Sequence, residues 1–158
     1  MKTIGIIGGL SWESTALYYK YLNERARKLV GGSHSARLLI HSFDFGEFAE
    51  YMASDDWETV SQEIVKAGRG LQTSGADILI IASNTIQIAL PDLEASVTVP
   101  VISIAEPTCN AITNLGFKNV GFLGTKYTME KPFLIEQFRS KGIEVSIPDT
   151  AGRTELQT

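Results

Sequence analysis

Small polar side chains gather directly after an apolar run in the middle of the chain. Residues 78–81 are four consecutive aliphatic residues, and Ser83, Asn84 and Thr85 follow them before helical spacing resumes. Hydroxyl and amide groups at such a place can hydrogen-bond a small anion such as a carboxylate, because open α/β sheets bind ligands at the carboxyl ends of their strands. The alternative, which this segment by itself favours, is that one of the three side chains only caps the following helix.

Two further strand ends carry polar groups. His41 and Asp44 stand at the end of the apolar stretch 36–41, and the Gly-Thr-Lys-Tyr-Thr run 124–128 follows the stretch 119–123. Backbone amides at the helix start after residue 124 could hold a carboxylate. For His41 we expect a partly buried histidine bonded to the backbone, and for Asp44 a cap on the next short helix.

The elements that would position these groups alternate along the chain. The apolar runs predict short strands, and the segments between them have the spacing of amphipathic helices. Such alternation predicts an α/β fold in which a parallel sheet is wound by right-handed crossovers and has helices on both faces. The polar strand ends would then share one rim. The predicted strands are 3–7, 36–41, 78–81, 99–104, 119–123 and 143–147.

Composition narrows the function classes. The 158 residues suffice for one domain or slightly more, with a core that needs no disulfide or metal. The 14 basic and 18 acidic side chains give a net charge of −4 without a basic cluster, so nucleic acid is not an expected partner. The single cysteine, Cys109, excludes an internal disulfide and makes a cytoplasmic location the default expectation. The apolar run 4–9 is too short for a signal-peptide core or a membrane span.

Glycines end the first predicted strand. Gly8 and Gly9 stand between this strand and a helix that runs to about residue 29, which resembles a nucleotide-binding start. A third glycine and a phosphate-loop lysine are missing, so the pattern disfavours dinucleotide or nucleoside triphosphate binding.

Several motifs together resemble the cofactor-independent aspartate/glutamate racemase family, over nearly the whole chain. They are the segments 4–15, 19–23, 34–36, 42–45, 84–85 and 124–129. The resemblance implies two similar α/β lobes with the active site in the cleft between them, and no cofactor or metal. It also implies a first lobe over residues 1–102 and, over 103–158, only part of a second lobe in a truncated chain.

The implied chemistry uses two cysteines on opposite faces of the substrate. Inversion at Cα removes a proton from one face and returns one to the other, and a thiol of lowered pKa can be either base or acid. The resemblance places the first cysteine at position 82, where this chain has Ala82, and the second in a segment beyond Thr158. Cys109 stands in a predicted helix start and reads as a buried structural thiol. The Ser83 hydroxyl is a far poorer base.

The resemblance also implies the substrate contacts. Ser83, Asn84 and Thr85 would hold the substrate carboxylate or amine, and Met52 stands where some relatives carry a polar contact. The remaining implied contacts are Leu10 and Trp12 lining the cleft, with Thr125, Lys126 and Thr128 from the second lobe.

The function expected from the resemblance is two-base inversion of aspartate- or glutamate-like substrates without pyridoxal phosphate, in a chain that is itself inactive. The alternative is a non-catalytic binding module for a small dicarboxylate or amino acid. An incomplete second lobe would leave an apolar sheet edge exposed, so a homodimer that covers it is expected.

Overall fold

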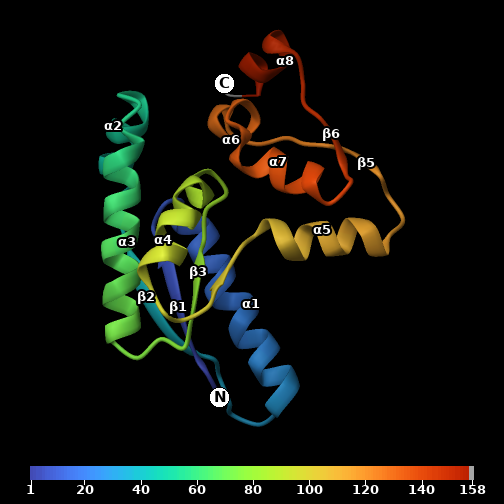
Figure 1. Ribbon diagram of the computed structural model, residues 1–158. Coiled ribbons are helices and arrows are strands. Elements are labelled where there is room, and N and C mark those ends of the chain that lie inside the picture. Colours follow the sequence, from blue (N-terminus) through green and yellow to red (C-terminus); the bar gives the residue numbers. More distant parts are fainter. Residues whose placement is uncertain (157–158) are drawn as a thin grey trace. The chain divides into compact units, whose positions relative to one another are not determined.

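The computed structural model describes residues 1–156, and the chain divides into two compact units, Met1–Ile102 and Ser103–Thr158 (Figure 1). Within the described residues, none of the helices combines the length and the apolar character needed to cross a membrane.

The first unit is built on a four-stranded sheet. Its strands are β1 (Thr3–Gly8), β2 (Arg37–Ser42), β3 (Ile78–Ile81) and β4 (Val101–Ile102), in the order β2-β1-β3-β4. Every neighbouring pair is parallel, which confirms the predicted α/β class with a parallel sheet. The connecting elements are α1 (Trp12–Val30), α2 (Phe45–Ala53), α3 (Trp57–Thr73), the 3-10 helix η1 (Thr85–Ala89) and α4 (Leu90–Ser96).

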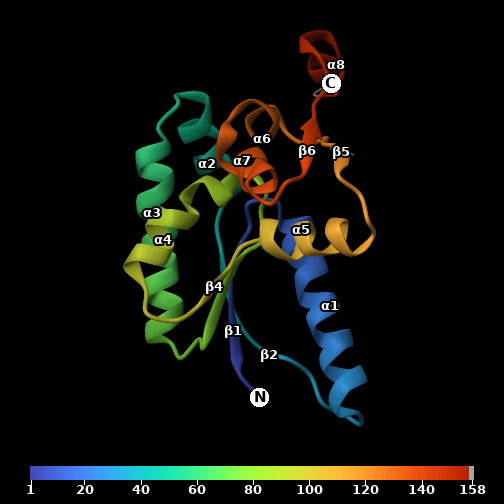
Figure 2. The same cartoon turned by 45° about the vertical axis from the view of Figure 1, so that its right-hand side comes forward.

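Helices cover both faces of this sheet. On one face Ile6, Ile80 and Ala82 form a buried cluster against which Tyr18 and Leu22 of α1 pack. On the other face a Cβ added to Gly5 would meet the side chains of Leu71 on α3 and of Leu79. Figure 2 shows α1 and α3 on opposite sides of the strands. Burial on both faces explains why β3 is a continuous aliphatic run rather than an alternating one.

The second unit is smaller. It contains α5 (Ala105–Asn114), β5 (Asn119–Gly121), α6 (Lys126–Glu130), α7 (Pro132–Ser140), β6 (Glu144–Ser146) and α8 (Thr150–Glu155). The two strands pair in parallel as a separate sheet. Its core includes a cluster of buried side chains, namely Ala105, Cys109, Leu134, Phe138 and Ile143.

Some predicted boundaries are wrong. The strand expected over 99–104 is only two residues long, and the helix expected to start after residue 124 is interrupted at Lys131, which has φ −88° and ψ 140°. Pro132 explains the interruption, because proline forces the residue before it out of the helical region. Pro91 instead lies in the first turn of α4, where its missing N–H is not needed. The segment from residue 148 onward, for which the sequence predicts no element, contains α8, and Asp149 caps this helix.

Candidate functional site

Three loops leave the sheet of the first unit at the same edge. Ile7 is in register with His41 on one side and with Ile81 on the other, so β1, β2 and β3 end side by side. Two hydrogen bonds extend this pairing into the loops. The Ala82 N–H donates to the Ile7 carbonyl at 2.9 Å, and the Phe43 N–H donates to the Gly8 carbonyl at 3.0 Å. We call this edge the carboxyl rim.

The turn at Gly8 and Gly9 passes very close to its neighbours. Gly9 has φ +80°, and a Cβ on it would overlap the Phe43 backbone, while a Cβ on Gly8 would overlap the Thr15 side chain. The buried Thr15 hydroxyl accepts a hydrogen bond from the Gly9 N–H at 2.9 Å and donates to the Ser11 carbonyl at 3.2 Å. The glycines therefore let α1 and the loop after β2 approach the end of β1.

The loop after β3 exposes its polar side chains unequally. Ala82 is only 1% exposed, Ser83 is half-buried, Asn84 is exposed and Thr85 is buried. The predicted cap is not supplied by Asn84, which occupies the N-cap position of η1 with helical torsions and no side-chain cap bond. Gln87, which the sequence did not identify as a functional residue, lies inside η1 and contacts this loop. The buried Gln87 side chain donates through Nε2 to the carbonyls of Ile81 and Ser83.

The remaining predicted residues of the first unit differ in exposure. Leu10 is 4% exposed within the core, whereas Trp12, the first residue of α1, is 68% exposed. Asp44 caps α2 by accepting from the Gly46 N–H at 2.9 Å, as predicted.

The prediction for His41 is wrong, because its side chain is exposed and its ring lies 4.5 Å from that of Phe43. Met52 is buried on α2.

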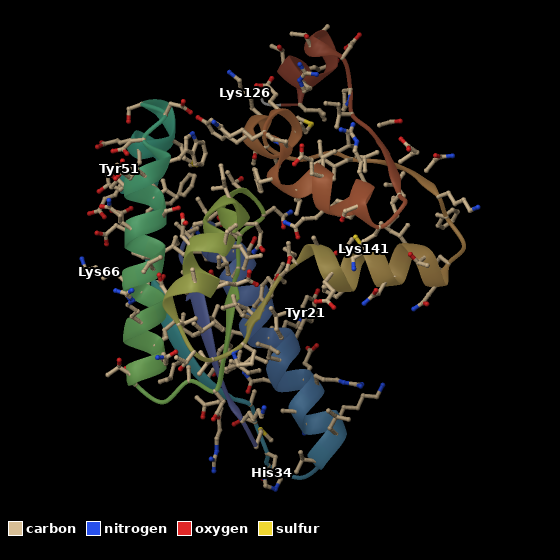
Figure 3. All side chains as sticks on the ribbon, in the orientation of Figure 1. Tyr21, His34, Tyr51, Lys66, Lys126 and Lys141 are labelled. Atoms are coloured by element: carbon tan, nitrogen blue, oxygen red, sulfur yellow. The ribbon has the colours of Figure 1, made fainter. Side chains whose placement is uncertain are left out.

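The predicted groups of the second unit lie at the start of α6. The Thr125 hydroxyl accepts from the Thr128 N–H, and the fully buried Thr128 hydroxyl donates to the Thr125 carbonyl at 2.9 Å. These bonds fix the turn after β5. Lys126, labelled in Figure 3, is the exposed first residue of the helix. The predicted convergence of these groups with Ser83, Asn84 and Thr85 in one cleft stays a prediction.

The single cysteine is a buried residue of the second unit. Cys109 is 3% exposed in the core of the second unit, on α5, which confirms the predicted buried thiol. Burial raises the pKa of the Cys109 thiol and outweighs the opposing effect of the Lys141 ammonium group. Lys141 is labelled in Figure 3. The thiol is therefore protonated at neutral pH and a weak nucleophile.

The carboxyl rim offers hydrogen-bonding groups, and the titratable side chains of His41 and Asp44 stand at and after the end of β2. Among residues 1–156, no three His, Cys, Asp or Glu side chains lie close enough together to hold a metal ion. The rim can therefore bind polar groups of a ligand, but its own side chains supply no thiol for proton abstraction.

The family model and the similar solved structures all concern racemases. The sequence model of the Asp/Glu/Hydantoin racemase family matches residues 7–158. A solved structure from Yersinia pestis, provisionally named an Asp/Glu racemase, is 38% identical with a TM-score of 0.92 and is matched over 99% of this chain and 68% of that one. An aspartate racemase homologue from Pyrococcus horikoshii OT3 is 35% identical with a TM-score of 0.85, over the same shares of the two chains.

A curated protein with an assigned activity is more distant. The broad specificity amino-acid racemase RacX of Bacillus subtilis strain 168 is 24% identical over 145 residues, which are 90% of this chain and 63% of RacX. The chain thus spans less than two thirds of the length of this relative.

Proposed function

The chain belongs to the Asp/Glu/Hydantoin racemase family, and we propose that it binds an acidic amino acid or a related small dicarboxylate at its carboxyl rim. The relatives named above are described as acting on aspartate, glutamate or a broad range of amino acids. Hydroxyl and amide groups at the ends of parallel strands suit a carboxylate or an ammonium group.

The proposed contacts are those that the family resemblance indicated. Ser83, Asn84 and Thr85 would bind the substrate from the first unit, and Thr125, Lys126 and Thr128 from the second. Leu10 and Trp12 would line the site. The exposure of Asn84, Trp12 and Lys126 supports a role for these three in contact with a ligand. Thr128 would act by fixing the turn that presents Thr125 and Lys126.

We further propose that the chain as given does not racemise its ligand. The observation that carries this proposal is the placement of the thiols. Cys109, the only cysteine of the sequence, is buried with a raised pKa, and the family resemblance would place the first catalytic cysteine at Ala82. Two-base inversion without pyridoxal phosphate needs an acid/base group on each face of Cα, and an alanine methyl group cannot exchange a proton.

Ala82 also favours a second candidate function, a non-catalytic binding module that retains the ligand site. The two candidates differ in what position 82 can recover. In a racemase altered at one position, Ala82→Cys restores exchange of the substrate α-hydrogen. In a binding module that has lost its catalytic geometry, the same substitution changes nothing but the local packing.

Calorimetric titration tests the binding proposal. Aspartate and glutamate should bind at millimolar concentration or below, and asparagine, which lacks the side-chain carboxylate, more weakly. Asn84→Ala should weaken aspartate binding by about tenfold, the loss expected for one hydrogen bond to a charged group. Thr108→Ala, on exposed α5 surface, is the control. Absence of heat for every dicarboxylate at millimolar concentration would contradict the proposal.

A homodimer and a cytoplasmic location complete the proposal. Ile40 on β2 and Ile102 on β4, the two outermost strands of the sheet, are 41% and 43% exposed. Exposed apolar edge strands favour association. A single buried cysteine is compatible with a reducing compartment.

A further inference from the structure

Gln87 is a buried polar side chain with an unusual set of hydrogen bonds. It lies on η1 and is 1% exposed, among apolar neighbours that include Ile86 and Ala89. Burying an amide is unfavourable unless its polar atoms are hydrogen-bonded. The partners of Gln87 therefore indicate what the side chain does.

Three of its hydrogen bonds go to carbonyls at the end of β3 and in the loop that follows. The Gln87 Nε2 donates to the Ile81 carbonyl at 3.2 Å and to the Ser83 carbonyl at 3.4 Å. The Gln87 backbone N–H donates to the Asn84 carbonyl at 3.3 Å. One residue thus holds three carbonyl groups within four consecutive positions. We call these contacts the Gln87 bridge.

The bridge holds a loop that has no side-chain cap from Asn84 at the start of η1. The path of the loop therefore depends on bonds from Gln87. In a planar trans peptide, the carbonyl and the following N–H point in opposite directions. A Ser83 carbonyl directed at the buried amide therefore turns the Asn84 N–H away from the core. The peptide between Ile81 and Ala82 is oriented in the same way. Its carbonyl accepts from Gln87, and its N–H, which belongs to Ala82, donates to the Ile7 carbonyl on β1.

We propose that Gln87 is a positioning residue of the ligand site, which acts by fixing the backbone of residues 82–84. This inference rests on the proposed function. The two carbonyls that Nε2 binds flank Ala82, the position that the family uses for proton transfer, and the second also precedes Asn84. Small displacements of positioned groups can change rates and affinities by large factors, so a residue that fixes this backbone affects binding without touching the ligand.

Two substitutions separate positioning from packing. Gln87→Met keeps the length of the side chain and removes its N–H donors. Ile86→Val removes one buried methylene from the adjacent position and leaves the bridge intact. Thermal unfolding of both variants shows how much stability each has lost. The comparison of ligand binding is then made between variants that have lost similar stability.

The first readout is the dissociation constant for aspartate. We expect at least about tenfold weaker binding in Gln87→Met and a change of less than about twofold in Ile86→Val. The second readout, NMR relaxation of backbone amides, needs no ligand. Gln87→Met should increase the mobility of residues 82–85, and Ile86→Val should not.

The outcomes are distinguishable. Equal affinity and equal mobility in the two variants would overturn the proposal and leave Gln87 a packing residue. If the unmodified chain binds no dicarboxylate, the proposed function fails. In that case the relaxation data decide separately whether Gln87 fixes the loop. Unchanged mobility of residues 82–85 in Gln87→Met would overturn the positioning role of Gln87.

Discussion

At the scale of single residues, position 82 and Cys109 decide what the chain can do chemically. In the proposed assignment Ala82 occupies the position of a catalytic thiol, and Cys109, the one thiol of the sequence, is buried in the second unit. Burial is also why that thiol is protonated. Proton abstraction from a substrate therefore has no thiolate available at neutral pH.

The state of Cys109 can be tested by its reaction with a disulfide reagent. Because burial raises the pKa of this thiol and blocks access, it should react at least about tenfold more slowly in the folded chain than in urea. The free energy of unfolding should also depend on pH. The native thiol keeps its proton at pH values where the unfolded thiol has lost it. Its contribution is complete below the unfolded pKa and is lost as the pH rises through the native pKa.

Cys109→Ala is the control for the pH series. The substitution should remove the part of the alkaline decrease in the free energy of unfolding that comes from the thiol. The decrease caused by other titrating groups should remain. Rapid modification of the native chain, or an unchanged pH profile in Cys109→Ala, would show that the thiol is accessible and does not titrate as described.

At the scale of elements, the turn between β1 and α1 determines how closely the loops of the rim approach one another. Gly9 has positive φ and lies against the Phe43 backbone. Gly9→Ala should therefore lower the free energy of unfolding by about 1–3 kcal/mol, from backbone strain alone. Gly70, inside α3, has open space around it, so Gly70→Ala should raise that free energy by about 0.5–1 kcal/mol.

Urea unfolding of the two variants measures this difference. A Gly9→Ala chain as stable as the unmodified one would mean that the turn has room to move. In that case the close approach of the three rim loops would not depend on glycine.

The sequence predicts regular elements better than it predicts the details of the rim. The run 78–81 identified β3 because both of its faces are buried, and the small polar residue before α2 identified the Asp44 cap. The bonds of Gln87 could not be predicted, because they depend on the path of the backbone between β3 and η1. Even so, a glutamine inside an otherwise apolar helical stretch was an available signal. His41 was predicted as partly buried because spacing does not show that β2 is an outer strand.

At the scale of the whole molecule, the two units differ in the extent of their cores. The first has a four-stranded sheet covered on both faces, and the second has two strands of three residues each. The family match extends across both units. An activity that needs groups from both units would require the two units of the chain to act together.

Assembly can be tested by light scattering. We expect a dimer that dissociates on dilution, and Ile40→Lys should shift the mass toward the monomer by placing a charge on the β2 edge. Leu29→Lys, at an apolar and more exposed site on α1, is the control and should have less effect. A monomer at high concentration, or equal effects of both substitutions, would contradict association through β2.

The central claim, that the chain has a ligand site without its acid/base groups, is tested most directly by hydrogen exchange at the substrate Cα. The unmodified chain and its Ala82→Cys variant are each incubated with L-aspartate in deuterated water, and the Cα–H signal and the optical rotation are followed together. General acid–base groups contribute on the order of 10²–10⁴-fold each, so we predict that neither signal changes in the unmodified chain. In Ala82→Cys the Cα–H signal should decay, while the optical rotation falls little because the opposite face still lacks a donor. Rapid loss of optical rotation in the unmodified chain would contradict the account and would identify an acid/base pair elsewhere, with His41 and Lys126 the first groups to replace.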